Sequence, residues 1–389
     1  MKSKEEQTAP KLRFKGYTDA WQQRKFSEIS KRIIRKNKKL TSLRPLTISA
    51  QYGLVDQTKF FNKRVASKDL SNYLLLFKGD FAYNKSYSSD APYGAVKQLV
   101  RYKSGVVSSL YFAFKINEDI NDNFVKYYFD SDKWHKNIYE NAAEGARNHG
   151  LLNITAQDFF SGNLKIAPSK FEQDEIGKLL SKLDETITLL QRKKTKYEEL
   201  KTALLQNLFP KKGQVVPILR FKNFQNDWQQ SKLEDRLEIN SGKDYKGLNK
   251  GKIPVYGTGG YMLSVDKSLS EKNAIGIGRK GTINKPQLLH APFWTVDTLF
   301  YLTPKANNNL IFLFYLFQKI NWSKYDESTG LPSLSKKTIN NIKESTPSNS
   351  EQKKIGNLLS KIDTVITLLN NQLSNLENLK QFLLQNMFI

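Results

Sequence analysis

The sequence has no cysteine and only three histidines. The absence of cysteine excludes disulfides, thiolate nucleophiles and cysteine-bound zinc or iron–sulfur sites. His135, His149 and His290 lie far apart in the chain and form none of the short spacings that hold a metal. We therefore expect no metal site, no cofactor and no catalytic group in this chain.

Long apolar runs are also missing. The longest, Leu310 to Phe317, is far shorter than the roughly 20 residues that a bilayer requires, and it suits a buried helix. The first residues, MKSKEEQTAP, lack the apolar core of a signal peptide. We expect a cytoplasmic protein with no membrane partner.

Positive charge, in contrast, is abundant. Lys and Arg number 62 against 37 Asp and Glu, which gives a formal net charge of +25 over 389 residues. Such an excess favours a polyanion partner that screens it, so nucleic acid is the first expectation. Aromatic residues make up 12% of the chain, which is enough for folded cores and excludes a disordered basic tail. The length predicts two or three domains.

One pattern occurs twice along the chain. The segment RFKGYTDAWQQRKF from Arg13 returns as RFKNFQNDWQQSKL from Arg220, and EQDEIGKLLSKLDETITLL from Glu172 returns as EQKKIGNLLSKIDTVITLL from Glu351. LKTALLQNLF, which begins at Leu200, returns later as LKQFLLQNMF. Repeats in the same order indicate a tandem duplication. The middles of the two copies keep the pattern but change their residues.

Each copy closes with a long stretch of helical periodicity. Apolar residues recur there in alternating steps of three and four, which is typical of a heptad seam. The seam and partner-binding positions are Ile176, Leu180, Leu183, Ile187, Leu190, Leu204, Ile355, Leu359, Ile362, Ile366, Leu369 and Leu383. About 37 helical residues give a rod of about 55 Å. Two similar seams predict two helices that pair with each other, and the alternative is two separate core helices.

The remaining sequence predicts two α+β globules. Short β-type runs such as Tyr73–Phe77, Val107–Phe114 and Thr298–Leu302 alternate with turns, and a helix is expected near Asn123–Phe129 and again near Asn309–Phe317. The expected boundaries are 1–170 for the first globule, 171–209 for its helix, 210–217 for a linker, 218–348 for the second globule and 349–389 for the last helix.

Three motifs resemble catalytic or cofactor signatures, but their context argues against that chemistry. GIGRKG, from Gly276, matches a dinucleotide-binding pattern, yet a strand or loop is expected after it where that fold needs a helix. DAPY, which ends at Tyr93, lacks the first proline of a methyltransferase motif, and a turn is the simpler interpretation. The ExK triplets at Glu199 and Glu351 fall on helical segments and are interpreted as solvated helix charge, not as a metal nuclease site.

Binding is therefore the expected activity. Basic, aromatic and small polar residues gather at loop positions, where Arg and Asn can read base edges while Lys and Ser contact phosphates. Solvated surface charge is the alternative for any single residue. The candidate DNA-binding residues are Lys78, Tyr83, Asn84, Lys85, Ser86, Arg147, Asn148, His149, Tyr256, Arg279, Lys280, Lys285, Ser333, Ser335 and Lys336.

A tandem of a variable globule and a near-repeated long helix resembles the DNA-specificity subunit of type I restriction–modification systems. The phrases EQxxIGxLLSKxDxxITLL and LKxxLLQNxF look like that family's helical regions, and GL pieces at Gly150 and Gly330 look like the close of its target-recognition domains. The resemblance covers essentially the whole chain. The globules diverge too far for base-reading residues to be carried over from the family.

The resemblance implies a subunit that neither methylates nor cuts DNA. It implies two target-recognition globules, each reading one half of a split, asymmetric site on double-stranded DNA. Two methyltransferase subunits would bind the helices and methylate adenine, and restriction subunits would join for cleavage of foreign DNA. S-adenosylmethionine, ATP and Mg would bind those partner subunits only. Two readers on one duplex are related by a pseudo-twofold axis, so the helices should pair as an antiparallel coiled coil.

Two other classes of protein remain as alternatives. A self-sufficient DNA-binding repressor is disfavoured because neither copy has a helix-turn-helix signature. A structural coiled-coil scaffold is disfavoured by the net charge and by the two elaborate globules.

Overall fold

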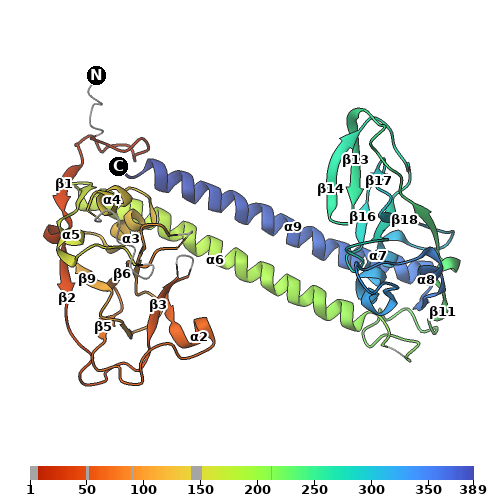
Figure 1. Ribbon diagram of the computed structural model, residues 1–389, viewed down its shortest axis with the longest axis horizontal. Helices are drawn as coiled ribbons and strands as arrows, with labels where there is room; N and C mark the ends of the chain where they lie inside the picture. The colour runs from red at the N-terminus through yellow and green to blue at the C-terminus, as the bar shows by residue number, and fades with distance from the viewer. Residues whose placement is uncertain (1–7, 50–51, 89–90, 142–150, 212) are drawn as a thin grey trace. The chain divides into compact units, whose positions relative to one another are not determined.

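The computed structural model describes residues 8–49, 52–88, 91–141, 151–211 and 213–389 (Figure 1). The chain forms two compact units. Unit 1 contains Met1–Leu189 and Gln372–Ile389, and unit 2 contains Leu190–Asn371. Both divisions fall inside long helices, α6 (Lys170–Asn207) and α9 (Asn349–Asn386), so each helix contributes one part to each unit.

Unit 1 is organised around an antiparallel four-stranded sheet in the order β2-β9-β6-β7. These strands are Ser30–Ile33, Phe112–Ile116, Phe81–Asn84 and Ala95–Gln98 in that order. The other pairs are β1 with β10, β3 with β4 and β5 with β8, which span Gln22–Lys25, Asn163–Ile166, Leu46–Ser49, Gly53–Asp56, Leu74–Phe77 and Ser104–Val107. The helices before α6 are α1 (Phe26–Ile29), α2 (Gln57–Phe61), α3 (Asp122–Asp130), α4 (His135–Asn141) and α5 (Ala156–Ser161).

Unit 2 repeats this plan. Its antiparallel sheet has the order β12-β18-β15-β16, formed by Leu237–Ser241, Leu299–Pro304, Ala274–Gly278 and Gln287–Leu289. A three-stranded sheet contains β14 (Gly260–Val265), β13 (Lys250–Gly257) and β17 (Trp294–Thr295), and β11 (Gln229–Lys232) pairs with β19 (Lys343–Thr346). The helices are η2 (Leu233–Asp235), α7 (Leu310–Lys319), η3 (Trp322–Tyr325) and α8 (Lys336–Asn341).

An aromatic helix fixes the start of each long helix against its own globule. Asn121 caps α3 by accepting from the Phe124 N–H at 2.8 Å, and Asn309 caps α7 in the same way through Phe312 at 2.9 Å. A glycine of the long helix faces each cap. A Cβ on Gly177 would lie 2.9 Å from Asn121 Oδ1, so only glycine permits this approach of α6 to α3.

Buried ion pairs explain the two repeated phrases at the ends of each globule. The Arg13 guanidinium donates to both carboxylate oxygens of Glu172 at 2.6 and 2.9 Å, and Arg220 donates to Glu351 at 2.8 and 2.9 Å. Both glutamates are fully buried. The expectation of a solvated Glu351 was therefore wrong, because its carboxylate anchors the segment that precedes unit 2's first strand to α9.

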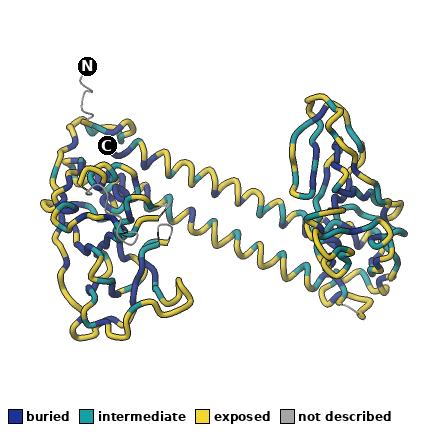
Figure 2. The backbone as a smooth tube through the Cα atoms, viewed as in Figure 1, coloured by how far each residue is buried: buried dark blue, intermediate teal, exposed yellow. Residues whose placement is uncertain are grey.

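A phenylalanine just after the end of each long helix packs in a globule core. Phe388 lies 6.3 Å from Trp21 and 5.3 Å from Phe124, between ring centroids, in the core of unit 1. Phe209, directly after α6, lies 5.3 Å from Phe312 in the core of unit 2. In Figure 2 the buried residues gather within each globule, while exposed positions prevail along the middle of both long helices.

One expectation needs correction. The run Val107–Phe114 is not one strand, because β8 ends at Val107 and a turn separates it from β9. The outer members of the expected seam pack in the cores of the globules. Ile176, Leu180 and Leu383 belong to the unit 1 core, and Ile355, Leu359 and Leu204 pack in the unit 2 core. The middle positions Leu183, Ile187, Leu190, Ile362, Ile366 and Leu369 are buried or half-buried, and their pairing as a seam remains a prediction.

Candidate nucleic-acid interface

A turn after β15 presents the strongest cluster of the sequence-predicted residues. The Leu334 N–H donates to the carbonyl of Arg279 at 2.9 Å, the Gly281 N–H donates to Pro332 O at 2.8 Å, and Lys280 forms a β-bridge with Ser333. The segment that precedes α8 is thereby fixed beside this turn. A Cβ on Gly278 would lie 2.2 Å from the Thr282 carbonyl, so this glycine serves the turn and not a cofactor.

Cations from two elements share one aromatic ring. The Arg279 guanidinium lies 6.0 Å from the centroid of Phe300, and Lys336 Nζ lies 5.9 Å from the same centroid. Arg279, Lys280 and Lys336 are exposed, whereas Phe300 is buried. We call Arg279, Lys280 and Lys336 the unit 2 basic patch. Its charges lie within reach of a common polyanion while their stems pack on apolar surface.

Unit 1 places its candidates on the equivalent strand end. The Leu152 N–H donates to Lys85 O at 2.9 Å, and Ser86 forms a β-bridge with Leu151. Lys85 Nζ lies 5.5 Å from the centroid of Phe112. Lys85 thus holds the place in unit 1 that Arg279 holds in unit 2, and Ser86 takes the place of Lys280.

Several other candidate residues form hydrogen bonds that stabilise the local fold. Ser86 donates its hydroxyl to Asn84 Oδ1 at 2.8 Å, which stabilises the turn. Ser335 caps α8 by accepting from the Thr338 N–H at 3.1 Å, and Asp326 accepts from the Ser333 N–H at 2.9 Å. Tyr256 is half-buried, and Lys285 is exposed on the loop that follows the basic patch.

Tyr83 was wrongly assigned to the DNA-binding surface. Its ring is fully buried and stacks on Phe159 at 4.6 Å, and its hydroxyl donates to the Tyr93 carbonyl at 2.9 Å. Burial raises the pKa of this phenol. Lys78 is exposed, but it belongs to a different turn, where its N–H donates to Lys103 O. Arg147, Asn148 and His149 lie outside the described residues.

A run of basic residues was missed. The stretch KRIIRKNKK from Lys31 to Lys39 begins inside the edge strand β2 and continues beyond it, and Lys31, Arg32 and Lys36 are exposed. Arg35 is paired with Asp80 and donates its Nε to Leu75 O at 2.8 Å, so it is tied to the fold. The density of charge in the sequence was the signal that could have identified this stretch.

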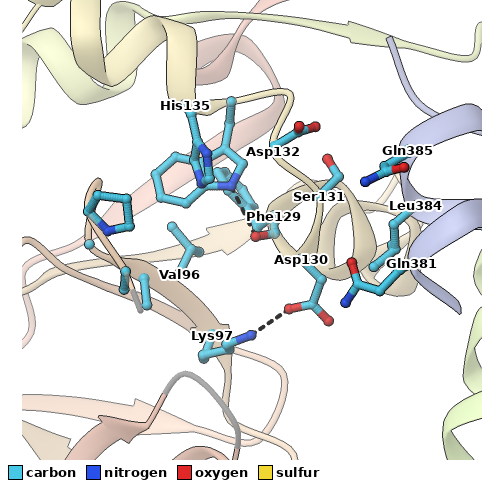
Figure 3. A pocket seen from close by; sticks show the side chains of 15 residues that line it. Val96, Lys97, Phe129, Asp130, Ser131, Asp132, His135, Gln381, Leu384 and Gln385 are labelled. Carbon is cyan, nitrogen blue, oxygen red and sulfur yellow. Dashed lines mark hydrogen bonds and ion pairs between the residues drawn. The ribbon is translucent and has the colours of Figure 1, made fainter. Parts of the chain in front are cut away.

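Unit 1 also contains a cavity of about 230 Å³ beside the end of α9 (Figure 3). His135 stacks on Tyr93 at 4.7 Å between ring centroids, and burial lowers its pKa. Lys97 and Asp130 form an ion pair at 2.6 Å, and Gln381 and Gln385 reach the cavity from α9. Ser131 donates its hydroxyl to Tyr128 O at 2.6 Å, so no serine nucleophile is activated by the histidine.

The described residues contain no group of His, Asp and Glu that could hold a metal, and no helix among them is long and apolar enough to cross a membrane. The arrangement on each unit is therefore one of surface charge on a rigid strand end. Such a surface can bind and orient an anionic polymer.

Comparison with known proteins agrees with this description. Residues 225–378 match the model of the type I restriction modification DNA specificity domain. The specificity subunit of the type I restriction enzyme MjaVIII from Methanocaldococcus jannaschii is 23% identical over 324 residues, which are 72% of this chain and 72% of that protein.

Solved structures share the fold along nearly the whole chain. The S subunit of a type I restriction–modification system from M. genitalium has a TM-score of 0.67 at 21% identity, covering 98% of this chain and 99% of that one. A chain from a study of the assembly and conformational transition of the type I R-M system has a TM-score of 0.52 at 15% identity, covering 95% and 97%.

Two tandem α+β units with charged strand ends define a duplicated binding protein. Residues 225–378 carry the type I restriction modification DNA specificity domain, and the whole chain is similar in sequence and fold to specificity subunits of type I restriction–modification systems. The resemblance found in the sequence is confirmed, and proteins of this class are the non-catalytic subunits of their systems.

Proposed function

We propose that this chain reads a bipartite, asymmetric site on double-stranded DNA, with one half-site contacted by each unit. The observation that carries the proposal is the equivalence of the two strand ends. The same backbone bond holds Lys85 in unit 1 and Arg279 in unit 2, yet the side chains displayed there differ. A shared frame with different contact groups is what recognition of two different half-sites requires.

The long helices act as the spacer in this proposal, and they pair as an antiparallel coiled coil with pseudo-twofold symmetry. Two ion pairs support the pairing, each within its own unit. Lys380 Nζ lies 2.7 Å from Asp184 Oδ1 in unit 1, and Lys201 Nζ lies 2.8 Å from Asp363 Oδ1 in unit 2. The residue numbers rise along α6 as they fall along α9, which fits an antiparallel arrangement.

Methyltransferase subunits dock on the outer faces of these helices, and restriction subunits join the complex for cleavage. Exposed leucines support this docking because they recur at corresponding positions. Leu189 on α6 corresponds to Leu368 on α9, and Leu200 corresponds to Leu379. S-adenosylmethionine, ATP and Mg belong to the partner subunits. The proposed boundaries at 170, 209, 217 and 348 divide the chain into two globules, two long helices and a linker. The globules recognise the DNA, and the helices set the spacing.

A selection experiment tests the proposal. The full chain is incubated with a pool of randomised duplexes, and bound duplexes are sequenced. We expect two short motifs separated by a gap of fixed length, and log affinity for the selected duplex should fall by several units per unit of log salt concentration. A pool without enriched motifs, or an affinity insensitive to salt, would contradict specific DNA recognition.

A second experiment tests whether the long helices set the distance between the two half-sites. Seven residues inserted after Lys194 preserve the heptad phase and add about 10 Å of helix, comparable with about three base pairs. Because α9 is not lengthened, part of the insertion can be absorbed by a bulge. We expect a gap longer by one to three base pairs with both motifs unchanged, and an unchanged gap would argue against the spacer role.

A further inference from the structure

A large aromatic ring stands exposed at the turn of unit 2's longest hairpin. Tyr261 is the second residue of β14, next to the turn, and is 63% exposed. In Figure 1 this hairpin of β13 and β14 stands apart from α7 and α8. A single exposed aromatic residue is common on protein surfaces, so its meaning depends on how it is held and on what lies beside it.

The ring of Tyr261 is held in place by its neighbours. Tyr256 is its cross-strand partner, and the two ring centroids are 6.5 Å apart in an edge-on arrangement. The Tyr261 hydroxyl is 3.2 Å from the Ser264 hydroxyl, within hydrogen-bonding distance. Tyr256 in turn packs against a cluster of buried residues that includes Val255 and Trp294. The exposed ring is thus supported from beneath, which lowers the entropy cost of a contact made by its free face.

The hairpin turn is joined to the segment that carries the unit 2 basic patch. Gln287 Nε2 donates to Gly257 O at 2.9 Å and to Thr258 O at 3.2 Å. A Cβ on Gly281 would lie 3.7 Å from Thr258 Oγ1, so the backbone that follows Lys280 passes next to the turn. The turn that precedes Tyr261 therefore lies next to the segment that carries Arg279 and Lys280 of the basic patch.

We propose that Tyr261 is a base-contacting residue, whose ring packs against an unstacked or groove-exposed base of duplex DNA while the basic patch holds the adjacent phosphates. A base presents a π-face to any aromatic side chain, and cations beside the ring match the charge of the backbone. This assignment rests on the proposed function and adds the specificity-determining residue of the second half-site.

Unit 1 has a counterpart. Tyr52 lies directly before β4 and is 51% exposed, and its N–H donates to Ser49 Oγ at 3.1 Å. Each tyrosine follows the proline of its hairpin, Pro45 or Pro254, at the same spacing. Both hairpins also make a parallel contact with a later strand, through Pro45 with Val106 and through Val255 with Trp294. The equivalent position of Tyr52 assigns it the same role at the first half-site.

The experiment measures binding of the full chain to a duplex selected by the wild-type chain from a randomised pool. The variants are Tyr261→Ala, Tyr261→Phe and, as the matched control, Ile218→Ala. Ile218 is 62% exposed in the same unit but lies away from the hairpin in the segment after α6. Loss of one aromatic stack should weaken binding of Tyr261→Ala by about 10- to 100-fold. Tyr261→Phe and Ile218→Ala should remain within about threefold of wild type.

The selection is then repeated with Tyr261→Ala. We expect relaxed base preference in one motif and an unchanged second motif, because the two units read separately. If Tyr261→Ala binds within about twofold of wild type and selects both motifs unchanged, the role of Tyr261 is overturned while the proposed function stands. If the wild-type chain itself enriches no motif, the proposed function fails and this assignment fails with it.

Discussion

Unit 1 and unit 2 share their internal bonds and differ in their outer surfaces. In each unit an arginine binds a buried glutamate of the long helix, a glutamine of that helix caps the start of an aromatic helix, and a tyrosine of the aromatic helix donates to an aspartate. On the surface, Lys85 and Ser86 stand where unit 2 has Arg279 and Lys280. The bonds that both units share attach the long helices to the globules. Among the residues that the structure describes, those at the strand ends make no such bonds to the helices, so they can differ between the two units.

Each unit contains a group of three bonded residues, which we call its clamp: a tyrosine of the aromatic helix, an aspartate of one long helix and a lysine of the other. Tyr127 donates to Asp184 at 2.8 Å, and Tyr315 donates to Asp363 at 2.7 Å. Burial, together with the neighbouring carboxylate, raises the pKa of both phenols, so each hydroxyl stays protonated and can donate. Each aspartate also binds a lysine of the other long helix. One clamp therefore joins a globule and two helices in each unit.

The largest expected effect concerns the buried ion pairs. Glu351→Ala leaves Arg220 without its partner in a site that is only 15% exposed, and we expect the free energy of unfolding of unit 2 to fall by about 3 kcal/mol. Hydrogen exchange of the slowest amides in α7 measures this loss, and those of α3 in unit 1 should not change. Glu377→Ala, which removes an exposed carboxylate from the same helix, is the control.

The same substitution in unit 1 sharpens the comparison. Glu172 also accepts from Trp21 Nε1 at 3.3 Å, so Glu172→Ala should destabilise unit 1 at least as strongly. If either substitution accelerated exchange equally in both units, the units would unfold as one and the separation between them would be contradicted.

A smaller effect is expected at the strand ends. Arg279→Ala removes the cation over Phe300, and Lys85→Ala removes the cation over Phe112. Each change should weaken binding of the selected duplex about tenfold, or about 1.4 kcal/mol, through one half-site only. Competition with duplexes altered in one motif identifies the half-site. Lys337→Ala, an exposed neighbour of Lys336, should bind as the wild type does, and loss of both motifs in any single variant would argue against separate readers.

The smallest effect concerns the unit 1 clamp and depends on pH. Burial alone would raise the pKa of Asp184, but Lys380, Lys126 and the Tyr127 hydroxyl outweigh it and the pKa is lowered. A lowered pKa means that the ionised carboxylate stabilises the fold above about pH 4 and that this contribution is lost as the pH falls further. Asp184→Asn should therefore reduce the free energy of unfolding of unit 1 by about 1 kcal/mol at neutral pH, since the pair is partly solvated.

Urea unfolding of the wild type and of Asp184→Asn at several pH values measures the difference. The two curves should begin to converge as the pH falls below about 4, the ordinary pKa of Asp, and should meet once the pH passes the lowered pKa of folded Asp184. A difference that stays constant between pH 7 and pH 3 would show that the carboxylate acts through packing and not through its charge.

Much of the frame could be predicted from the sequence, for physical reasons. Sequence segments that occur in both copies mark positions where the two units form the same contacts. A regular spacing of apolar residues marks a helix that buries one face. The helices α6 and α9 occupy the stretches where that pattern predicts them. The burial of Glu351 could not be predicted, because its partner Arg220 is distant in the chain and a charged residue on a helix is usually solvated.

The surface was harder to predict than the frame. Tyr83 and Lys85 are two residues apart, so strand alternation alone would place both side chains on the same face. The strand β6 ends at Asn84, which leaves Tyr83 buried in the sheet and Lys85 half-buried just beyond the strand end. The sequence does not show where the strand ends, so it could not separate the two residues. Tyr261 was missed because an isolated tyrosine in a glycine-rich turn carries no local signal, and only the bonds from Gln287 reveal that the turn adjoins the basic patch.

The sequence by itself determined the duplication, the long helices, the positive charge and the family resemblance, because these properties depend on local order and composition. Tertiary structure decided which glutamates are buried, which end of each helix completes which core, and which side chains share one exposed surface. Those outcomes depend on contacts between residues far apart in the chain. Burial and charge pairing at such contacts are set by three-dimensional packing, which local sequence does not specify.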